Sequence, residues 1–464
     1  MAFKFLIAPR FVPPLDKGYR PAVLANHKYL EAVRNSAEAV PLVLALERRD
    51  GTRSRFETVV FADGHPDAEQ NLYYVERILK FLLWQRGGWK IFVGGPQAIG
   101  EYIHQVYAIG GARDFDCRLM SKVYGNPFTV VACDAEQVPV ASETQKSLGR
   151  HLDGNRIGFD LGASDLKVSA VVDGEAIFST EIVWQPREQT DPSYHRERIQ
   201  AALDLAKSKL PSLDAIGGSS AGVYVNNRPM VASLFRGIPE SEFGRVRSMF
   251  VEIGEAMGVP LEIINDGEVT ALAGSMSLEA NSVLGIAMGS SEAAGYVTDE
   301  GNLTDWLNEL AFAPLDYSPE APVDEWSEEK GVGANYFSQQ CVFRLAPSAG
   351  IELPLDVSDA EKLKSVQVKL EAGHKGAEQI WQSIGIYLGY TIAHYADFYD
   401  IEHVLILGRC TSGKGGPLIL EGARAVLSAE FPDLADQIHI QLPDEKSRRV
   451  GQSIAAASLP DLKG

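Results

Sequence analysis

Short apolar runs alternate with amphipathic stretches along most of the chain. Before residue 150, apolar runs at residues 40–46 and 56–61 predict two strands, and residues 68–85 show the periodicity of a helix that ends at a glycine pair. A buried strand is predicted at residues 89–93, followed by a helix that reaches Tyr107. Strands and helices that alternate in this way are typical of an α/β fold.

The alternation continues from residue 156, with glycine and small polar residues where the strands end. We predict strands at residues 157–161, 167–172, 215–218, 261–264 and 403–407, a further strand from residue 283 to a turn at 289–291, and helices at residues 195–209, 240–257 and 378–399. Ligands bind at the ends of strands in such folds. The aromatic residues of the last helix recur at helical spacing, which favours a buried face over a carbohydrate-stacking surface.

Length and charge limit the possible functions. The chain has 464 residues, more than one hydrophobic core usually serves, so two or three domains are expected, with a boundary near residue 150 where the pattern changes. The formal net charge of −19 argues against nucleic acid as the main partner, because phosphate backbones are held by clustered lysine and arginine. A small anionic ligand needs only a few local donors and is not excluded.

The cysteines and the apolar segments indicate the compartment. The four cysteines are widely spaced, so we expect reduced thiols in the cytoplasm rather than a disulfide framework or a metal cluster. The apolar part of residues 1–9 is too short for a signal peptide, and no apolar run approaches the ~20 residues that span a bilayer. We therefore expect a cytoplasmic protein without a membrane partner.

Two strand–turn–strand units carry candidate phosphate-binding turns. The first contains Asp160, Gly162, Ser164 and Lys167, and the second turns at Gly289 and Ser290, about 125 residues later. Backbone N–H groups in such a turn can surround phosphate oxygens, and Asp160 can hold Mg²⁺ through water. An ordinary polar hairpin is an equally good interpretation of the first turn alone, but one turn from each of two lobes can clamp a polyphosphate.

A third strand ends in Asn265-Asp266-Gly267 between these two turns. A carboxylate at a strand end that faces a cleft can accept the proton of a hydroxyl group that attacks the γ-phosphorus of ATP. The alternative is structural: Asp266 precedes a helical stretch, where an Asx residue is a favoured N-cap. Asp266 is thus a candidate general base or a helix cap.

Together these segments resemble the ROK family of sugar kinases and sugar-responsive repressors, in the actin/hexokinase/heat-shock-ATPase superfamily. The resemblance covers about residues 155–464. It is carried by the first phosphate motif, by Asn265-Asp266, by Gly289-Ser290, by residues 387–389 and 404–408, and by a closing segment at 451–457. The order and spacing of these segments agree with the family throughout.

The resemblance implies two actin-like (ribonuclease H-like) lobes around a nucleotide cleft, with an N-terminal α/β accessory domain at residues 1–150. The first lobe would be residues 151–275, completed by a C-terminal helix at 445–464, and the second lobe residues 276–444. The implied activity is ATP-dependent transfer of the γ-phosphate to a sugar hydroxyl. ATP and Mg²⁺ would be used, and a homodimer is possible.

The resemblance also implies roles for individual residues. Asp266 would be the general base and Asp160 the Mg²⁺ ligand. The sugar would be bound by Asn265, Asn308, Glu309 and Ser220. Phosphates and the adenosine would be contacted by Gly162, Ser164, Lys167, Gly289, Ser290, Gly408 and Gly413.

The chain departs from the family at several positions. Phe312 replaces a histidine that binds zinc, and residues 314–333 lack the cysteines of the zinc loop, so no structural zinc is expected. Glu292 follows the second phosphate turn, where it would repel phosphate if it pointed inward. Arg409 replaces a glycine of the adenosine motif and either stacks on adenine or lies on the surface.

Two questions stay open in the sequence. Arg236, near a sugar-contacting element of the family, favours a phosphorylated or acidic sugar if it faces the cleft, and is otherwise an exposed arginine. The alternative to a kinase is a catalytically silent sugar- or nucleotide-binding regulator, which the altered second turn favours and the retained Asp160 and Asp266 oppose. A DNA-binding repressor is disfavoured because the first 150 residues show no basic recognition helix, and an actin-like filament or chaperone ATPase would need no sugar site.

Overall fold

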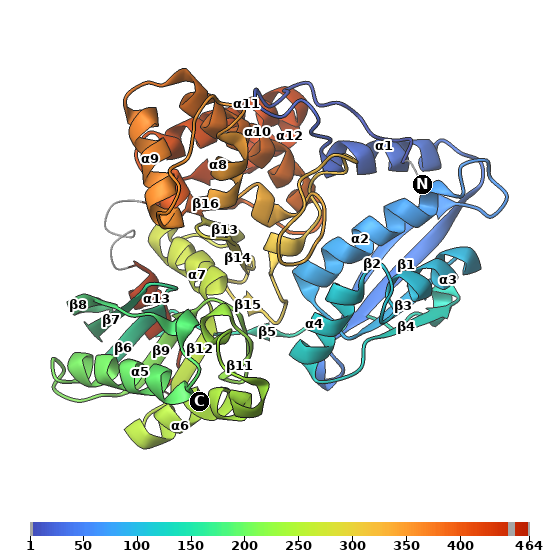
Figure 1. Cartoon of the computed structure of the whole chain (residues 1–464). Helices are drawn as coiled ribbons and strands as arrows, with labels where there is room; N and C mark the ends of the chain where they lie inside the picture. The colour runs from blue at the N-terminus through green and yellow to red at the C-terminus, as the bar shows by residue number, and fades with distance from the viewer. Residues whose placement is uncertain (1–2, 444–450, 463–464) are drawn as a thin grey trace.

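The computed structural model describes residues 3–443 and 451–462, which form three α/β units around a common centre (Figure 1). Among the described residues, no helix is both long and apolar enough to cross a membrane. Part of the predicted C-terminal helix, residues 445–450 and 463–464, lies outside the described residues.

The N-terminal unit has a four-stranded sheet in the order β2-β1-β3-β4. Its elements are α1 (Ala22–Arg34), β1 (Ala39–Glu47), β2 (Arg53–Phe61), α2 (Gln70–Arg86), β3 (Lys90–Gly94), α3 (Gln97–Val106), α4 (Asp114–Tyr124) and β4 (Thr129–Cys133). The five elements predicted from periodicity are present, within two residues of the expected bounds at most ends. Helices α1 and α4 and strand β4 were not predicted from the sequence.

The first lobe is a five-stranded sheet in the order β12-β9-β6-β7-β8. It consists of β6 (Asn155–Leu161), β7 (Asp165–Val172), β8 (Glu175–Val183), α5 (Pro192–Lys207), β9 (Ala215–Ser220), β10 (Val223–Val225), β11 (Arg228–Val231), α6 (Phe243–Met257), β12 (Leu261–Asn265) and α13 (Gln452–Ala457). The first three sheet strands form an antiparallel meander, and β9 and β12 then add parallel to β6.

The second lobe repeats this topology. Its strands β13 (Val283–Met288), β14 (Glu292–Val297) and β15 (Leu303–Thr304) form the meander, and β16 (His403–Leu407) and β17 (His439–Gln441) add parallel to β13. Its remaining elements are β5 (Gln145–Lys146), which pairs with β15, and the helices α7 (Asp266–Leu278), α8 (Gln339–Leu345), α9 (Asp359–Glu371), α10 (Lys375–Ala396), α11 (Gly415–Glu430) and α12 (Pro432–Gln437). Two sheets with one strand order are the signature of the actin-like fold, so the predicted fold class is confirmed.

Helix α13 closes the first lobe as expected. A Cβ atom on Gly217 would lie 1.6 Å from the carbonyl oxygen of Ala456, and one on Gly158 would lie 1.8 Å from that of Ser453. The helix therefore rests directly on the backbones of β6 and β9, at positions where only glycine leaves room.

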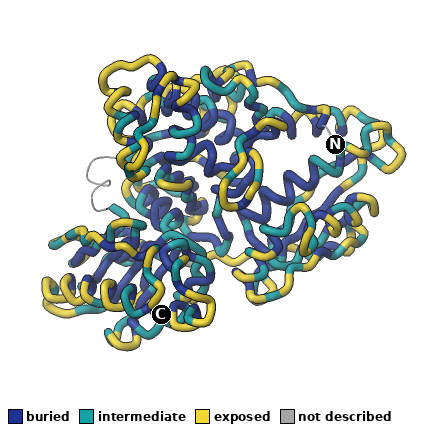
Figure 2. Tube along the Cα trace, viewed as in Figure 1, coloured by how far each residue is buried: buried dark blue, intermediate teal, exposed yellow. Residues whose placement is uncertain are grey.

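The N-terminal unit shares its core with the second lobe. Tyr29 and Trp84 belong to one continuous cluster of buried side chains with Leu284 and Trp381, whereas the first lobe has a separate core. Helix α2 is buried along most of its length (Figure 2). The backbone N–H of Ala22 donates to the carbonyl oxygen of Leu315 at 2.9 Å, and Gln85 Nε2 donates to that of Phe398. The division into domains at residues 150 and 275 stays a prediction.

Candidate functional site

The ends of β6 and β12 bring two aspartates of the first lobe together. Asp160 pairs in register with Ser219 of β9, which in turn pairs with Ile264 of β12, and Asp266 follows two residues later. Because these strands are parallel, their carboxyl ends meet at one edge of the sheet. The negative charge of Asp160 contributes to raising the pKa of Asp266, so the two carboxyl groups are electrostatic neighbours.

Asp160 is buried at this edge. Its Oδ1 accepts a hydrogen bond from Ser219 Oγ at 2.7 Å, and Lys167 is its register partner on β7. Burial raises the pKa of Asp160, while the Ser219 hydroxyl and the charge of Lys167 oppose that rise. An aspartate held in this way has one oxygen occupied by the protein and a second that can bind a hydrated cation.

Asp266 is the first residue of α7, not its cap. The N-cap is Asn265, whose Oδ1 accepts from the N–H of Gly267 at 2.7 Å, so the structural alternative for Asp266 is wrong. Asp266 lines a cavity instead. Burial, with the charge of Asp160, raises the pKa of Asp266 to about 7. A carboxyl group with such a pKa can take up and release a proton near neutral pH.

Asn265 and Glu309 are in contact across the cleft between the lobes. Asn265 Nδ2 donates to Glu309 Oε1 at 3.2 Å and to the carbonyl oxygen of Gly222 at 2.8 Å. The backbone N–H of Glu309 donates to the carbonyl oxygen of Trp84 at 3.0 Å, at the C-terminal end of α2. The N-terminal unit thus positions Glu309, which is adjacent to Asn265 as the sequence predicted.

These residues border a cavity of about 330 Å³, within the range of about 300–1,000 Å³ that holds small ligands. Three carboxyl groups, those of Asp266, Glu292 and Glu309, line it together with the turn at Gly289 and Ser290. Burial and the charge of Asp266 raise the pKa of Glu309 to about 8. Acceptor groups that are grouped in a recess are suited to a polyhydroxy ligand, because each of its buried hydroxyl groups needs a partner.

Glu292 does point inward. Its side chain is 3% exposed, Tyr395 donates to its Oε1 at 3.4 Å, and Oε2 has no partner among the described residues. Burial raises the pKa of Glu292 from 4.5 to about 8, with the charge of Glu309 adding to the effect. The carboxyl group is therefore largely protonated at neutral pH, which reduces the repulsion of phosphate expected from the sequence.

This burial predicts that stability depends on pH. A carboxyl group whose pKa is higher in the folded state keeps its proton while the unfolded chain releases it, so stability falls as pH rises from about 4.5 towards 8. Glu292→Gln cannot lose this proton. We expect it to raise the free energy of unfolding at pH 8 by on the order of a few kcal/mol and to change little at pH 4.5, as measured by urea unfolding.

The exposed Glu325 supplies the control for that measurement. Glu325→Gln should leave the difference in the free energy of unfolding between pH 4.5 and pH 8 as it is in the wild type. An equal effect of Glu292→Gln at both pH values would show that packing, not proton release, separates the two proteins.

The first candidate phosphate turn holds an unexpected acid. The N–H of Gly162 donates to the carbonyl oxygen of Asp165, and a Cβ on Gly162 would lie 2.7 Å from the Asp165 carboxylate. Ser164 Oγ is 3.5 Å from the same carboxylate. Asp165 forms an ion pair with Arg409 of the second lobe at 3.7 Å. Arg409 is thus exposed but spans the cleft, rather than lying apart from it.

The other predicted nucleotide contacts lie on the second lobe. Gly408 follows β16 with a φ of +98°, and a Cβ there would lie 2.5 Å from the carbonyl oxygen of Met288. This close approach places the predicted adenosine segment against the predicted second phosphate turn, which begins at Gly289. Gly413 lies farther along, beside the carboxylate of Glu371.

Two predicted sugar ligands do not line the cavity. Ser220 is fully buried, and its Oγ accepts from Tyr224 at 2.7 Å. Asn308 is also buried, with its Oδ1 accepting from Tyr399 at 2.9 Å. Both side chains are hydrogen bonded within the protein interior and neither lines this cavity, so their contact with sugar stays a prediction. Ala221 and Glu309, which adjoin Ser220 and Asn308 in sequence, line the cavity instead.

An aromatic cluster stands where the family resemblance implies a zinc-binding histidine. The ring of Phe312 lies 4.5 Å from that of Trp84, 5.2 Å from that of Trp326 and 5.8 Å from that of Phe115, measured between centroids. Within residues 3–443 and 451–462, no group of three histidine, cysteine or acidic side chains is arranged to hold a metal. The N-terminal unit therefore supplies, through Trp84 and Phe115, packing for this segment.

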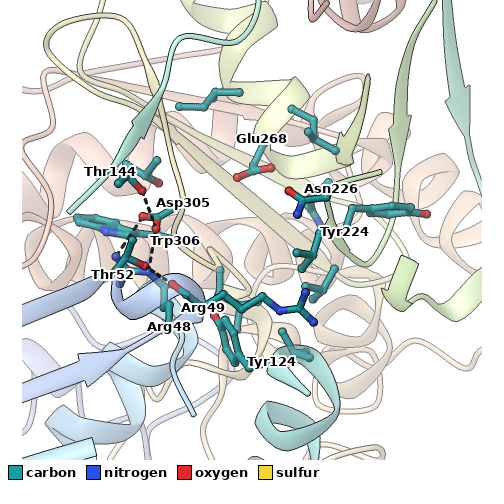
Figure 3. A pocket seen from close by; sticks show the side chains of 18 of the residues that line it. Arg48, Arg49, Thr52, Tyr124, Thr144, Tyr224, Asn226, Glu268, Asp305 and Trp306 are labelled. Carbon is teal, nitrogen blue, oxygen red and sulfur yellow. Dashed lines mark hydrogen bonds and ion pairs between the residues drawn. The ribbon is translucent and has the colours of Figure 1, made fainter. Parts of the chain in front are cut away.

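A second cavity shares Asn265 with the first and is lined by Arg49, Tyr124, Tyr224 and Glu268 (Figure 3). At its edge Arg48 is almost fully buried and forms ion pairs with Glu143 and, at 3.1 Å, with Asp305. Thr144 Oγ1 donates to Asp305 as well. These interactions join the N-terminal unit to Asp305, the residue that directly follows β15, the last strand of the second meander.

The duplicated topology and the cleft define a two-lobed, actin-like protein. Among solved structures, the chain is similar to the ROK hexokinase of Thermus thermophilus, with a TM-score of 0.50, 16% identity, and coverage of 65% of this chain and 96% of that one. It is equally similar to a ROK glucokinase of Streptomyces griseus in complex with glucose and AMPPNP (0.50, 15%, 66% and 98%). A ROK transcriptional regulator, homologous to the Mlc protein of Escherichia coli, also matches (0.50, 18%, 66% and 78%). The chain therefore has the ROK fold.

By sequence alone, the chain matches no family profile. No curated protein matches it either. The likeness is in the fold, and its neighbours include both kinases and a regulator.

Several residues that line the cavity were not predicted from the sequence, and Trp84, Leu119 and Arg187 are among them. Trp84 and Leu119 come from the N-terminal unit, and Arg187 follows β8. The sequence held one signal for Trp84, since residues 73–84 are apolar on several faces of the helix, which indicates burial against more than one partner. Nothing in the local sequence marks Leu119 or Arg187.

Proposed function

We propose that this protein is an ATP-dependent kinase that transfers the γ-phosphate of ATP to a hydroxyl group of a sugar. The observation that carries the proposal is Asp266, a carboxyl group with a pKa of about 7 at the wall of a ligand-sized cavity between two actin-like lobes. An attacking hydroxyl needs a positioned base of this kind.

The acceptor would be bound by the side chains that line the cavity. Asn265 and Glu309 offer an amide and a carboxyl group to its hydroxyls, and Asp266 would accept the proton of the attacking one. The recess between the lobes and the N-terminal unit would keep water, a competing acceptor, away from the phosphorus. Trp84 and Phe312 form an apolar wall on one side.

The donor would lie across the two turns, against Gly162, Ser164, Gly289 and Ser290, with Gly408 and Gly413 beside the adenosine. Space above the second turn fits this role, because a Cβ on Gly289 would meet only the carbonyl oxygen of Ser291, at 3.7 Å. Mg²⁺, which neutralises phosphate charge in such transfers, would be held by the available oxygen of Asp160.

A silent regulator of the same fold is the second candidate. Two observations favour it: Asp165 places a negative charge within the first turn, and Glu292 occupies the second. Phosphate binding would then require that Arg409 or Mg²⁺ offset Asp165. Against this candidate, a sensor that transfers no phosphate has no need of Asp266 as a general base.

Release of ADP by the purified protein tests the proposal. With Mg-ATP and a panel of hexoses, amino sugars and sugar phosphates, at least one sugar should raise ADP release well above the sugar-independent rate. A panel that leaves ADP release unchanged, while sugars still raise the melting temperature, would contradict the kinase and support the regulator.

A further inference from the structure

Two arginines of the first lobe face the acceptor cavity and its continuation. Arg187 lines the cavity that contains Asp266, together with Ser233 and Ser290. It also lines a larger adjoining cavity of about 900 Å³, which Arg236 borders. The two cavities share these walls, so a ligand bound beside Asp266 can extend past Arg187.

The two guanidinium groups have no acidic partner. Neither forms an ion pair with any residue in the described part of the chain, and the polar contact given for Arg187 is a long one of 3.5 Å to Ser233 Oγ. Arg187 Nε is buried without a hydrogen-bond partner. Burial and the nearby charge of Arg236 lower the pKa of Arg187. Two unpaired positive charges lie close together at a cavity wall, in a chain whose net charge is −19. A bound anion would balance their mutual repulsion.

The other charges of the larger cavity are largely neutralised. Lys122 pairs with Glu240 at 3.4 Å, and Arg344 pairs with Asp16 at 3.1 Å. Asp324 accepts hydrogen bonds from Ser327. The acidic Glu325 is an exposed member of the wall. Arg187 and Arg236 therefore remain as the basic groups that a ligand can use.

The backbone that carries these arginines is rigidly held. The buried His195 donates from Nε2 to the carbonyl oxygens of Pro186 at 3.0 Å and of Leu234 at 3.2 Å, and so ties together the two segments that carry Arg187 and Arg236. A Cβ on Gly237 would lie 2.8 Å from the carbonyl oxygen of Arg187, so the segments are in direct contact. The backbone that carries the two donors is thus preorganised, although Arg236 itself is exposed, and this reduces the entropy lost when a ligand binds.

The same segment is tied to the first phosphate turn. Trp184 Nε1 donates to the carbonyl oxygen of Gly162 at 2.9 Å, and the N–H of Trp184 donates to that of Ser164. Arg187 follows three residues later. An anionic group at Arg187 can therefore belong either to the acceptor or to the γ-phosphate of the donor, and the shared chemistry is that of a phosphate or carboxylate.

We infer that Arg187 and Arg236 form an anion-binding subsite of the acceptor cavity, so that the acceptor is a sugar carrying a phosphate or carboxylate group. The inference rests on the proposed function only where it treats the bound sugar as the phosphate acceptor. Binding of the anionic sugar at Arg187 and Arg236 does not depend on that function. The anionic group would lie between the two guanidinium groups, and the rest of the sugar would reach Asn265, Asp266 and Glu309.

Binding measured without turnover tests the subsite. Titration calorimetry on the full chain, with glucose, glucose 6-phosphate, glucuronate and AMPPNP as probes, should show an anionic sugar bound more tightly than glucose. Arg187→Ala and Arg236→Ala should each weaken the anionic sugar by roughly 10- to 100-fold and leave glucose unchanged, since a hydrogen bond to a charged group is lost. Arg198→Ala, an exposed arginine of the same lobe, is the matched control.

The outcomes separate this inference from the proposed function. Anionic-sugar binding that depends on Arg187, with no ADP release, supports the subsite and contradicts the kinase. Phosphorylation of a neutral sugar at an unchanged rate in Arg187→Ala supports the kinase and overturns the subsite. Loss of AMPPNP binding alone in Arg187→Ala also overturns it, because the arginine then serves the donor. Circular dichroism of each variant confirms that it is folded.

Discussion

Asp266→Asn is expected to reduce sugar-dependent ADP release by about 100- to 10,000-fold while leaving sugar binding nearly unchanged. The amide keeps the size of the side chain and its place at the start of α7, but it cannot accept the proton of the attacking hydroxyl. The helix stays capped, because Asn265, not Asp266, is the N-cap. Steady-state kinetics should therefore show a fall in kcat with little change in the sugar's dissociation constant from calorimetry.

Asp204→Asn, an exposed residue on α5, is the control and should keep wild-type kinetics. The pH profile gives a second readout. Because the base must be a carboxylate, wild-type turnover should rise as pH increases through about 7, the pKa of Asp266, and the residual activity of Asp266→Asn should lack that step. Unchanged turnover in the variant would remove Asp266 from the mechanism.

Asp116→Ala is expected to lower the free energy of unfolding by about 3–5 kcal/mol, because it leaves the fully buried ammonium group of Lys80 without its partner. Lys80 Nζ donates to both oxygens of Asp116, at 2.8 and 2.9 Å, and Trp84 Nε1 donates to Oδ1 at 3.0 Å. Burial lowers the pKa of Lys80 despite this ion pair. Denaturant unfolding at pH 7 measures the loss.

Two further variants make this prediction specific. Asp114→Ala removes an exposed ion pair with Arg118 on the same helix and should change stability little. The double variant Lys80→Met/Asp116→Leu replaces the buried pair by apolar groups and should recover most of the stability, since such replacements are often neutral. A double variant as unstable as Asp116→Ala would show that packing around Trp84, not the unpaired charge, is responsible.

Sequence patterns predicted the elements around the cleft because those elements obey local rules. Strands β6, β12 and β16 each contain apolar residues and are followed at once by a glycine or an aspartate, and α10 repeats its apolar residues at helical spacing. Strand β8 was not identified. Its side chains alternate between exposed and half-buried, so the apolar signal is weak at this edge of the sheet.

Which side chains line the cavity depends on contacts between distant segments, and no local sequence pattern predicts those contacts. Asn265 and Glu309 were predicted together, and they are hydrogen bonded. Asn308 and Ser220 are adjacent in sequence to cavity residues, but each side chain is turned into the interior, towards Tyr399 and Tyr224. Residue type does not predict whether a polar side chain in a loop or at a strand end points into the cavity or into the interior. A polar side chain can find hydrogen-bond partners in either direction.

The shared core of the N-terminal unit and the second lobe has a consequence for how the chain is synthesised. Residues 3–133 are translated before the second lobe, yet partners of Phe11, Ala22 and Gln85 are Tyr390, Leu315 and Phe398, which are translated hundreds of residues later. Contacts of such long sequence separation slow folding. The nascent N-terminal unit must therefore expose part of α2 until the second lobe is complete, and that helix is the segment that chaperones would cover in the meantime.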